Sequence, residues 1–155
     1  MSLPANITAA IVDALYEDAL ALSEEARAVF DERYQAPALF QPEPEMRIAM
    51  SCEALRTTTR LMHALAWLLN QKAYLNGEMS EFQLRRHGRL PPAEPASDPK
   101  QLALLDARTH DLIERSRAFY ARVARIDAAW RKHFAMQPAA IHRLKDRLGQ
   151  AYAVH

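Results

Sequence analysis

Glycine and cysteine are scarce in this sequence of 155 residues, which has three glycines and a single cysteine, Cys52. So few glycines exclude the glycine-rich loops that bind phosphate, and no P-loop, dinucleotide fingerprint or nucleophile elbow is present. One cysteine excludes an internal disulfide, and a free thiol is typical of the reducing cytosol. A signal peptide and a run of about twenty apolar residues are also lacking. We therefore expect a cytoplasmic protein without a membrane span.

Charge of one sign is not in excess, because the net charge is only +1. The charges are nevertheless unevenly distributed. Residues 1–55 contain ten acidic and three basic side chains, whereas residues 56–155 contain nine acidic and seventeen basic ones. This asymmetry has two interpretations: a basic face for an acidic partner, or acidic and basic helices that pack side by side.

Three long segments, at about residues 6–34, 45–75 and 98–134, place apolar side chains at every third or fourth position. This spacing is typical of amphipathic helices. A proline-rich loop at residues 87–99 separates the second segment from the third. We therefore predict an all-α fold, with three long helices in an antiparallel bundle that occupies residues 1–136.

Local signals predict where several helices begin and end. The Asn-Gly pair at residues 76–77 is a typical helix C-cap. Ser80 with Gln83 has the spacing of a capping box, which predicts a short helix after the second long one. Asp98, followed by proline, is a favourable N-cap and should begin the third long helix.

The tail, residues 137–155, is predicted to be a separate short amphipathic helix with basic side chains. Pro138 interrupts the preceding helical pattern, since proline cannot donate a backbone hydrogen bond. Arg143, Lys145 and Arg147 are candidate partner contacts. Three bases are a weak signal for nucleic acid, so we do not expect DNA or RNA as a partner of the tail.

The second long helix carries two apolar stripes, which predicts a neighbouring helix on each flank. The stripes are Met46, Met50, Ala54, Thr57, Leu61, Leu65 and Leu68, and Ile48, Cys52, Leu55, Thr59, Met62, Ala66 and Leu69. Bases and aromatics occupy the remaining side, which is either a partner-contact surface or a solvated edge whose aromatic rings fold over the bundle. The candidate contacts there are Arg56, Arg60, His63, Trp67 and Tyr74. Packing explains threonines at positions 57 and 59, but we find no role for Thr58.

The third long helix has a seam of nearly heptad spacing. A helix of this length would be about 55 Å long, more than a small domain covers. The seam is therefore interpreted as core, as a homodimer contact, or as both in different parts. Its members include Leu105, Leu112, Phe119, Ile126 and Trp130.

Catalytic and metal-binding patterns are not found in the sequence. No two of the six histidines stand four residues apart on a helix, and none has a cysteine at ligand spacing. We expect a helical interaction module with no enzymatic activity, cofactor or metal. Two alternatives stay open: a nucleic-acid-associated helical regulator, and a small all-α enzyme or sensor with an arginine-lined pocket.

The segment EALRTTTRLMHALAWLLNQKAYLNGEMS, residues 53–80, resembles the RcdA family of alphaproteobacterial regulators of CtrA degradation. Residues 15–26 and 102–122 fit the same family more loosely. The resemblance is carried by Leu55-Arg56, Thr58-Thr59-Arg60-Leu61-Met62, Trp67-Leu68-Leu69, Gln71-Lys72-Ala73 and Asn76-Gly77-Glu78-Met79.

This resemblance implies a homodimer of three-helix bundles that has no enzymatic activity. It implies an adaptor that helps the ClpXP protease degrade the cell-cycle transcription factor CtrA and other protein cargo. The implied partners are ClpX and co-adaptors similar to CpdR and PopA, and the implied location is the cytoplasm, with recruitment to a cell pole.

Overall fold

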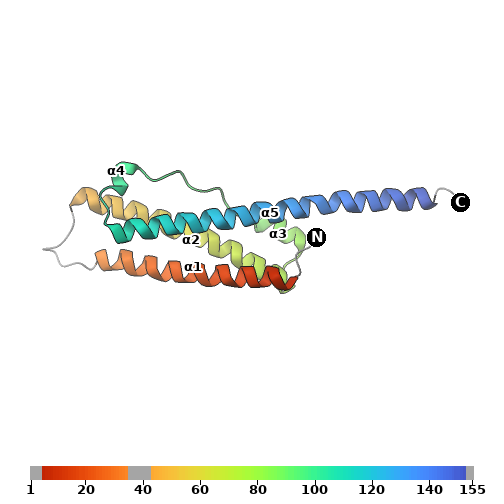
Figure 1. Cartoon of the computed structure of the whole chain (residues 1–155), viewed down its shortest axis with the longest axis horizontal. Coiled ribbons are helices and arrows are strands. Elements are labelled where there is room, and N and C mark those ends of the chain that lie inside the picture. Colours follow the sequence, from red (N-terminus) through yellow and green to blue (C-terminus); the bar gives the residue numbers. More distant parts are fainter. Residues whose placement is uncertain (1–4, 35–42, 153–155) are drawn as a thin grey trace. The chain divides into compact units, whose positions relative to one another are not determined.

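Every element of the computed structural model, which describes residues 5–34 and 43–152, is a helix. No strand occurs in these ranges, so the prediction of an all-α fold is confirmed. None of the helices found there is long and apolar enough to cross a membrane. In chain order the helices are α1 (Ala5–Tyr34), α2 (Pro44–Leu75), α3 (Glu81–His87), α4 (Pro99–Leu102) and α5 (Ala107–Tyr152), drawn in Figure 1.

The chain divides into two compact units, residues 1–121 and residues 122–155, and the division falls within α5. The first unit contains α1 to α4 and the beginning of α5. The second unit contains the rest of α5. The predicted domain limit at residue 136 therefore lies inside the second unit.

Helices α1 and α2 pack along each other and run in opposite directions (Figure 1). The apolar face of α1 is buried or half-buried, as is the first of the two stripes predicted on α2. Burying one large apolar side chain contributes about 1.5–3 kcal/mol, so these faces supply much of the stability. The buried apolar residues of the two helices include Val12, Leu15, Ala19, Ala26, Val29 and Phe30 on α1, and Met50, Leu61, Ala64, Trp67 and Leu68 on α2.

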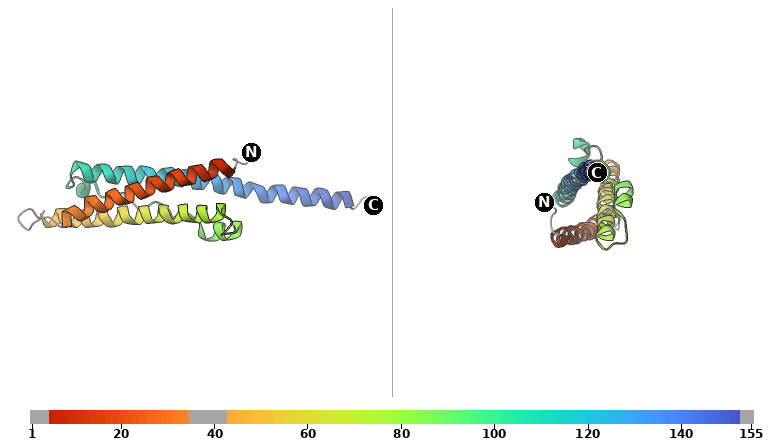
Figure 2. Two further views of the ribbon diagram at one scale, coloured as in Figure 1. Left: turned by 90° about the horizontal axis from the view of Figure 1, so that it is seen from below. Right: turned by 90° about the vertical axis from the view of Figure 1, so that its right-hand side faces the viewer.

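The beginning of α5 runs in the same direction as α2, because residues 88–98 lead the chain back along α2 (Figures 1 and 2). Two contacts mark this return. The Tyr120 hydroxyl donates a hydrogen bond to the carbonyl of Pro91, and the Ser97 hydroxyl donates one to Glu53, early in α2. The expected antiparallel order therefore holds for α1 and α2 but not for α2 and α5.

Oppositely charged side chains link the acidic first helix to the basic parts of the chain. The Lys72 ammonium lies 3.1 Å from the Asp13 carboxylate and 4.5 Å from the centre of the Tyr16 ring. The Arg115 guanidinium on α5 forms a bidentate pair with Glu25 on α1, and one of its two hydrogen bonds is 2.8 Å long. These contacts support the interpretation that acidic and basic helices pack side by side.

The predicted helix ends in the middle of the chain are confirmed. Helix α2 ends at Leu75, and Gly77 has a φ of +76°, a conformation that strains any residue with a Cβ. The side chain of Ser80 accepts a hydrogen bond from the Gln83 N–H, and the Gln83 side chain accepts one from the Ser80 N–H. This capping box begins α3.

The predicted third helix is wrong at its start. Asp98 does cap a helix, through a 2.9 Å bond from the Lys100 N–H, but α4 ends after one turn at Leu102. After α4, the amides of Leu104 and Leu105 donate hydrogen bonds to carbonyls three residues earlier in the chain. Helix α5 begins only at Ala107. Asp106 precedes α5, and aspartate is favoured at such a position because its short side chain competes with helix formation.

The predicted break at Pro138 is also wrong, because α5 continues through it to Tyr152. An interior proline costs a helix about 3 kcal/mol and one hydrogen bond. Alanine, leucine, lysine and arginine are frequent on both sides of Pro138, and these residues have high helix propensity. The tail is therefore the end of one long helix and not a separate short one.

We predict that Glu25→Gln destabilises the protein in a pH-dependent way. The hydrogen bonds from Arg115 lower the pKa of Glu25 below its ordinary value of 4.5. A carboxyl whose pKa is lower in the folded state stabilises the fold above the unfolded-state pKa, and this contribution is lost as the pH falls through the folded-state pKa. Both side chains are partly exposed, so we expect a loss of about 1 kcal/mol or less at pH 7.

Chemical denaturation at pH 7 and at a pH well below 4.5 measures this effect. The difference between Glu25→Gln and the unchanged protein should shrink at the lower pH. Glu24→Gln is the matched control, because the Glu24–Arg27 pair is exposed and lies on one helix. An equal loss of stability at both pH values would contradict the role of the Glu25 charge.

Candidate interaction surface

The basic and aromatic stripe that the sequence offered as a contact surface on α2 faces inward. Trp67 is only 2% exposed, and Gln71 beside it is buried. Arg56, Arg60, His63 and Tyr74 are half-buried. The interpretation as an exposed docking surface is therefore wrong for Trp67, whose side chain fills the core. A partner contact at the four half-buried residues stays a prediction. About one residue's turn, roughly 100°, separates it from the first apolar stripe. Buried residues come from both stripes, so together they form one broad inward face.

A buried carboxylate lies at the centre of this inward face. The Glu53 side chain is fully buried and accepts a 3.1 Å hydrogen bond from Arg56 and a 2.9 Å hydrogen bond from the Ser97 hydroxyl. A buried charge is costly unless it is paired and hydrogen-bonded, and these two donors meet that condition. The contact attaches the end of the proline-rich loop to α2.

Arg60 has a similar internal role. Its guanidinium donates a 2.7 Å hydrogen bond to the hydroxyl of Ser116 on α5, and that hydroxyl donates to the carbonyl of Ile113. Burial lowers the pKa of Arg60. Arg60 thus connects α2 to α5 within the first unit.

The exposed side of α2 is the second predicted apolar stripe. Its four large members are solvent-exposed: Ile48 by 59%, Leu55 by 70%, Met62 by 63% and Leu69 by 51%. Ser51, Thr58 and Ala66 are exposed between them. The described part of the chain provides no helix on this flank, so the prediction of a neighbour there is wrong for a single copy.

We call these seven residues, Ile48, Ser51, Leu55, Thr58, Met62, Ala66 and Leu69, the α2 strip. They are the only residues classed as exposed between positions 48 and 69, and none of them is charged. A solvent-facing helix normally carries charged side chains on that side. The signal was present in the sequence as a stripe without charge, but periodicity does not reveal how many sides of a helix are covered.

The seam predicted on the third long helix is core in the first unit. Leu112 and Phe119 are buried, whereas Leu105 is half-buried in the turn before α5. In the second unit Ile126 and Trp130 are half-buried. The core interpretation is thus confirmed for Leu112 and Phe119, and a dimer contact at the other positions stays a prediction.

The predicted tail contacts are partly within the described side chains. Lys145 and Arg147 are exposed, as are Leu144 and Leu148. The side chain of Arg143 lies outside the described part. The exposed residues form an apolar pair accompanied by two bases.

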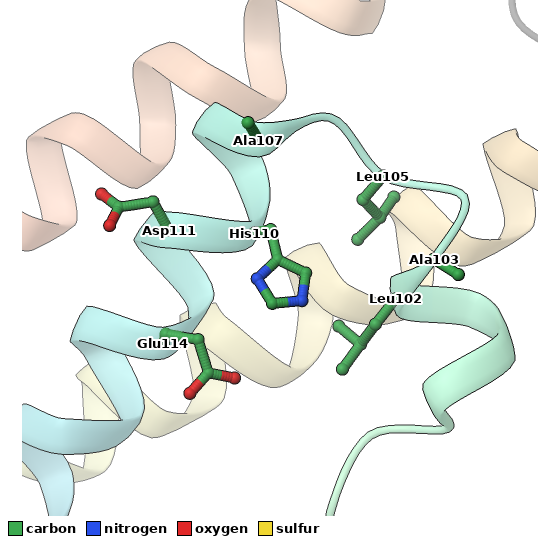
Figure 3. A pocket seen from close by; sticks show the side chains of 7 residues that line it. All are labelled: Leu102, Ala103, Leu105, Ala107, His110, Asp111 and Glu114. Carbon is green, nitrogen blue, oxygen red and sulfur yellow. The ribbon is translucent and has the colours of Figure 1, made fainter.

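A pocket of about 530 Å³ lies where α4 leads into α5 (Figure 3). Its acids already have partners, since Asp111 accepts a 2.8 Å bond from Arg115 and Glu114 pairs with Arg117 at 3.2 Å. No arginine lines this pocket, so it does not match the arginine-lined pocket considered from the sequence. The lining residues are Leu102, Ala103, Leu105, Ala107, His110, Asp111 and Glu114.

The described residues contain no group of three or more His, Cys, Asp or Glu side chains that could hold a metal ion. Cys52 is a half-buried free thiol on α2. The arrangement that distinguishes this chain is therefore the α2 strip.

We predict that Arg56→Ala strongly destabilises the protein. It removes the only charged donor to Glu53 that the described contacts show, and leaves a buried carboxylate with the Ser97 bond. Breaking a buried ion pair in this way typically costs about 3–5 kcal/mol. Arg27→Ala is the matched control, because it breaks an exposed pair of the same spacing with Glu24 and should cost less than about 1 kcal/mol. Urea denaturation measures both, and equal small losses would contradict the importance of the buried pair.

The comparisons with known proteins give one match. A comparison with curated proteins and one with solved structures find none. A family model described as "Protein of unknown function (DUF1465)" matches residues 4–152. This match is compatible with the RcdA resemblance but does not carry that name. Because the model covers nearly the whole sequence, the chain belongs to the DUF1465 family.

Proposed function

We propose that this protein is an RcdA-like adaptor: a non-enzymatic regulator of ClpXP-dependent proteolysis that acts through protein–protein contacts. In this proposal its three long helices act as one bundle, the bundle forms a homodimer, and the dimer aids degradation of CtrA or similar cargo. Its partners are ClpX and co-adaptors similar to CpdR and PopA. It works in the cytoplasm and is recruited to a cell pole.

The observation that carries the proposal is the exposed and uncharged α2 strip. Burying one of its large side chains would contribute about 1.5–3 kcal/mol, and the strip has four of them. Exposed apolar patches of this kind typically mark sites of protein–protein interaction. Leu55, Thr58, Met62 and Leu69 of the strip are also among the residues that carry the RcdA resemblance.

A second surface supports an adaptor role, because an adaptor must bind more than one protein. In the second unit, Lys145 and Arg147 are exposed next to the apolar side chains of Leu144 and Leu148. An apolar pair with basic neighbours suits a partner surface that is apolar and acidic. Binding two proteins on one scaffold raises their effective concentration for each other without new chemistry.

We predict that Lys145→Glu combined with Arg147→Glu weakens capture of ClpX and its co-adaptors at least several-fold. Both side chains are exposed, so the fold should be unchanged, and the reversed charges would repel an acidic partner surface. Pulldown with purified ClpX, alone and with co-adaptors, measures capture, and CtrA degradation measures the consequence.

Arg122→Glu combined with Arg125→Glu is the matched control for this experiment. It makes the same change of charge at two other exposed positions of α5. Equal capture by the unchanged protein and both double variants would remove the basic tail from the proposal. Failure of the unchanged protein to bind ClpX or any co-adaptor would overturn the adaptor role itself.

A further inference from the structure

The large side chains of the α2 strip repeat every seven residues, at Ile48, Leu55, Met62 and Leu69. This period is typical of a helix that packs lengthwise against another helix. From Ile48 to Leu69 the strip is about 32 Å long, at 1.5 Å per residue. It therefore has the spacing and length of a helix–helix seam, but no helix of the described chain covers it.

A small side chain follows each large one after four residues. These small residues are Cys52, Thr59, Ala66 and Ala73, and all four are half-buried or exposed. Large and small side chains thus alternate along the seam from residue 48 to residue 73. Tight packing between two helices is achieved when large side chains of one helix face small side chains of the other.

This alternation of large and small side chains along α2 is complementary to the same alternation read in the opposite direction. If a second α2 is laid across the first in the opposite direction, every large residue meets a small one. The pairs are Ile48 with Ala73, Leu55 with Ala66, Met62 with Thr59, and Leu69 with Cys52. In a parallel arrangement with the same register, large residues would face large ones and small residues would face small ones, which leaves gaps.

We propose that the α2 strip is the surface on which a second copy of this chain docks, with the two α2 helices antiparallel about a two-fold axis close to Arg60 and Leu61. The proposal rests on the homodimer of the proposed function and specifies its interface. A two-fold interface must be complementary to itself, and the reversed large–small order meets that condition. Because the strip has no charge, two copies meet without like-charge repulsion.

The arrangement gives Thr58 a role. Thr58 is exposed and lies near the middle of the strip, close to the proposed axis. A short uncharged side chain at that place lets two helices approach closely, whereas a lysine or glutamate would bring a charge into the apolar seam. The three consecutive threonines thus lie in three different environments: Thr57 is buried, Thr58 is exposed and Thr59 is half-buried.

The first test is the mass in solution by light scattering across a dilution series. We expect the unchanged chain to have twice the mass of one chain, and Leu55→Glu combined with Met62→Glu to have the mass of one. Both replaced side chains are exposed in the single chain, so circular dichroism should show an unchanged helical fold. Phe82→Glu is the control, because Phe82 on α3 is 71% exposed and lies outside the strip; this variant should stay dimeric.

The second test fixes the direction of the helices with a short bifunctional thiol cross-linker. Leu69→Cys should cross-link two chains, because the new thiol would lie opposite Cys52 of the partner. Adding Cys52→Ser should abolish the cross-link. Cross-linking that persists without Cys52 would show like residues facing each other and would overturn the antiparallel arrangement.

Other results would overturn the interface while leaving the adaptor role open. A monomeric unchanged chain would overturn both this interface and the homodimer of the proposed function, but not the capture of ClpX. A dimer that survives the Leu55 and Met62 replacements would place the contact elsewhere. Conversely, a dimer with all the expected cross-links that captures no ClpX would confirm the interface and count against the proposed function alone.

Discussion

Helix α2 is apolar on two opposite sides, and the described chain covers only one of them. This constraint governs the rest of the structure. The covered side holds Trp67, Leu61 and Leu68 against the first unit's core, with α1 packed along α2. The other side leaves four large apolar side chains in water. An exposed apolar strip without charge is typical of a surface that a partner covers, because covering it would remove its apolar area from water.

Several polar residues of α2 form internal hydrogen bonds that hold other parts of the first unit against this helix. Glu53 attaches the proline-rich loop through Ser97, and Arg60 attaches α5 through Ser116. These bonds fix the return of the chain along α2 and therefore the parallel direction of α2 and the beginning of α5. Buried polar bonds of this kind favour one arrangement of helices over others that would bury a similar apolar area, because an unpaired charge is costly in each alternative.

The family match and the structure give different information about this protein. The match to DUF1465 covers almost the whole chain, but the description of that family names no function. The structure shows an exposed apolar strip on α2 and exposed bases in the second unit. The proposed adaptor role rests on these two surfaces together with the RcdA resemblance.

The sequence alone determined the all-α class, the apolar face of α1, the end of α2 just before Asn76-Gly77 and the capping box of Ser80, because these depend on neighbours within a turn or two. Tertiary structure decided which faces of α2 are covered. Periodicity shows that the faces differ, but coverage depends on where distant segments return. Trp67 was therefore wrongly assigned to the surface, and Leu55 was wrongly expected to have a neighbouring helix within the same chain. The continuation of α5 through Pro138 was likewise decided by the whole helix, whose other hydrogen bonds outweigh the one that proline removes.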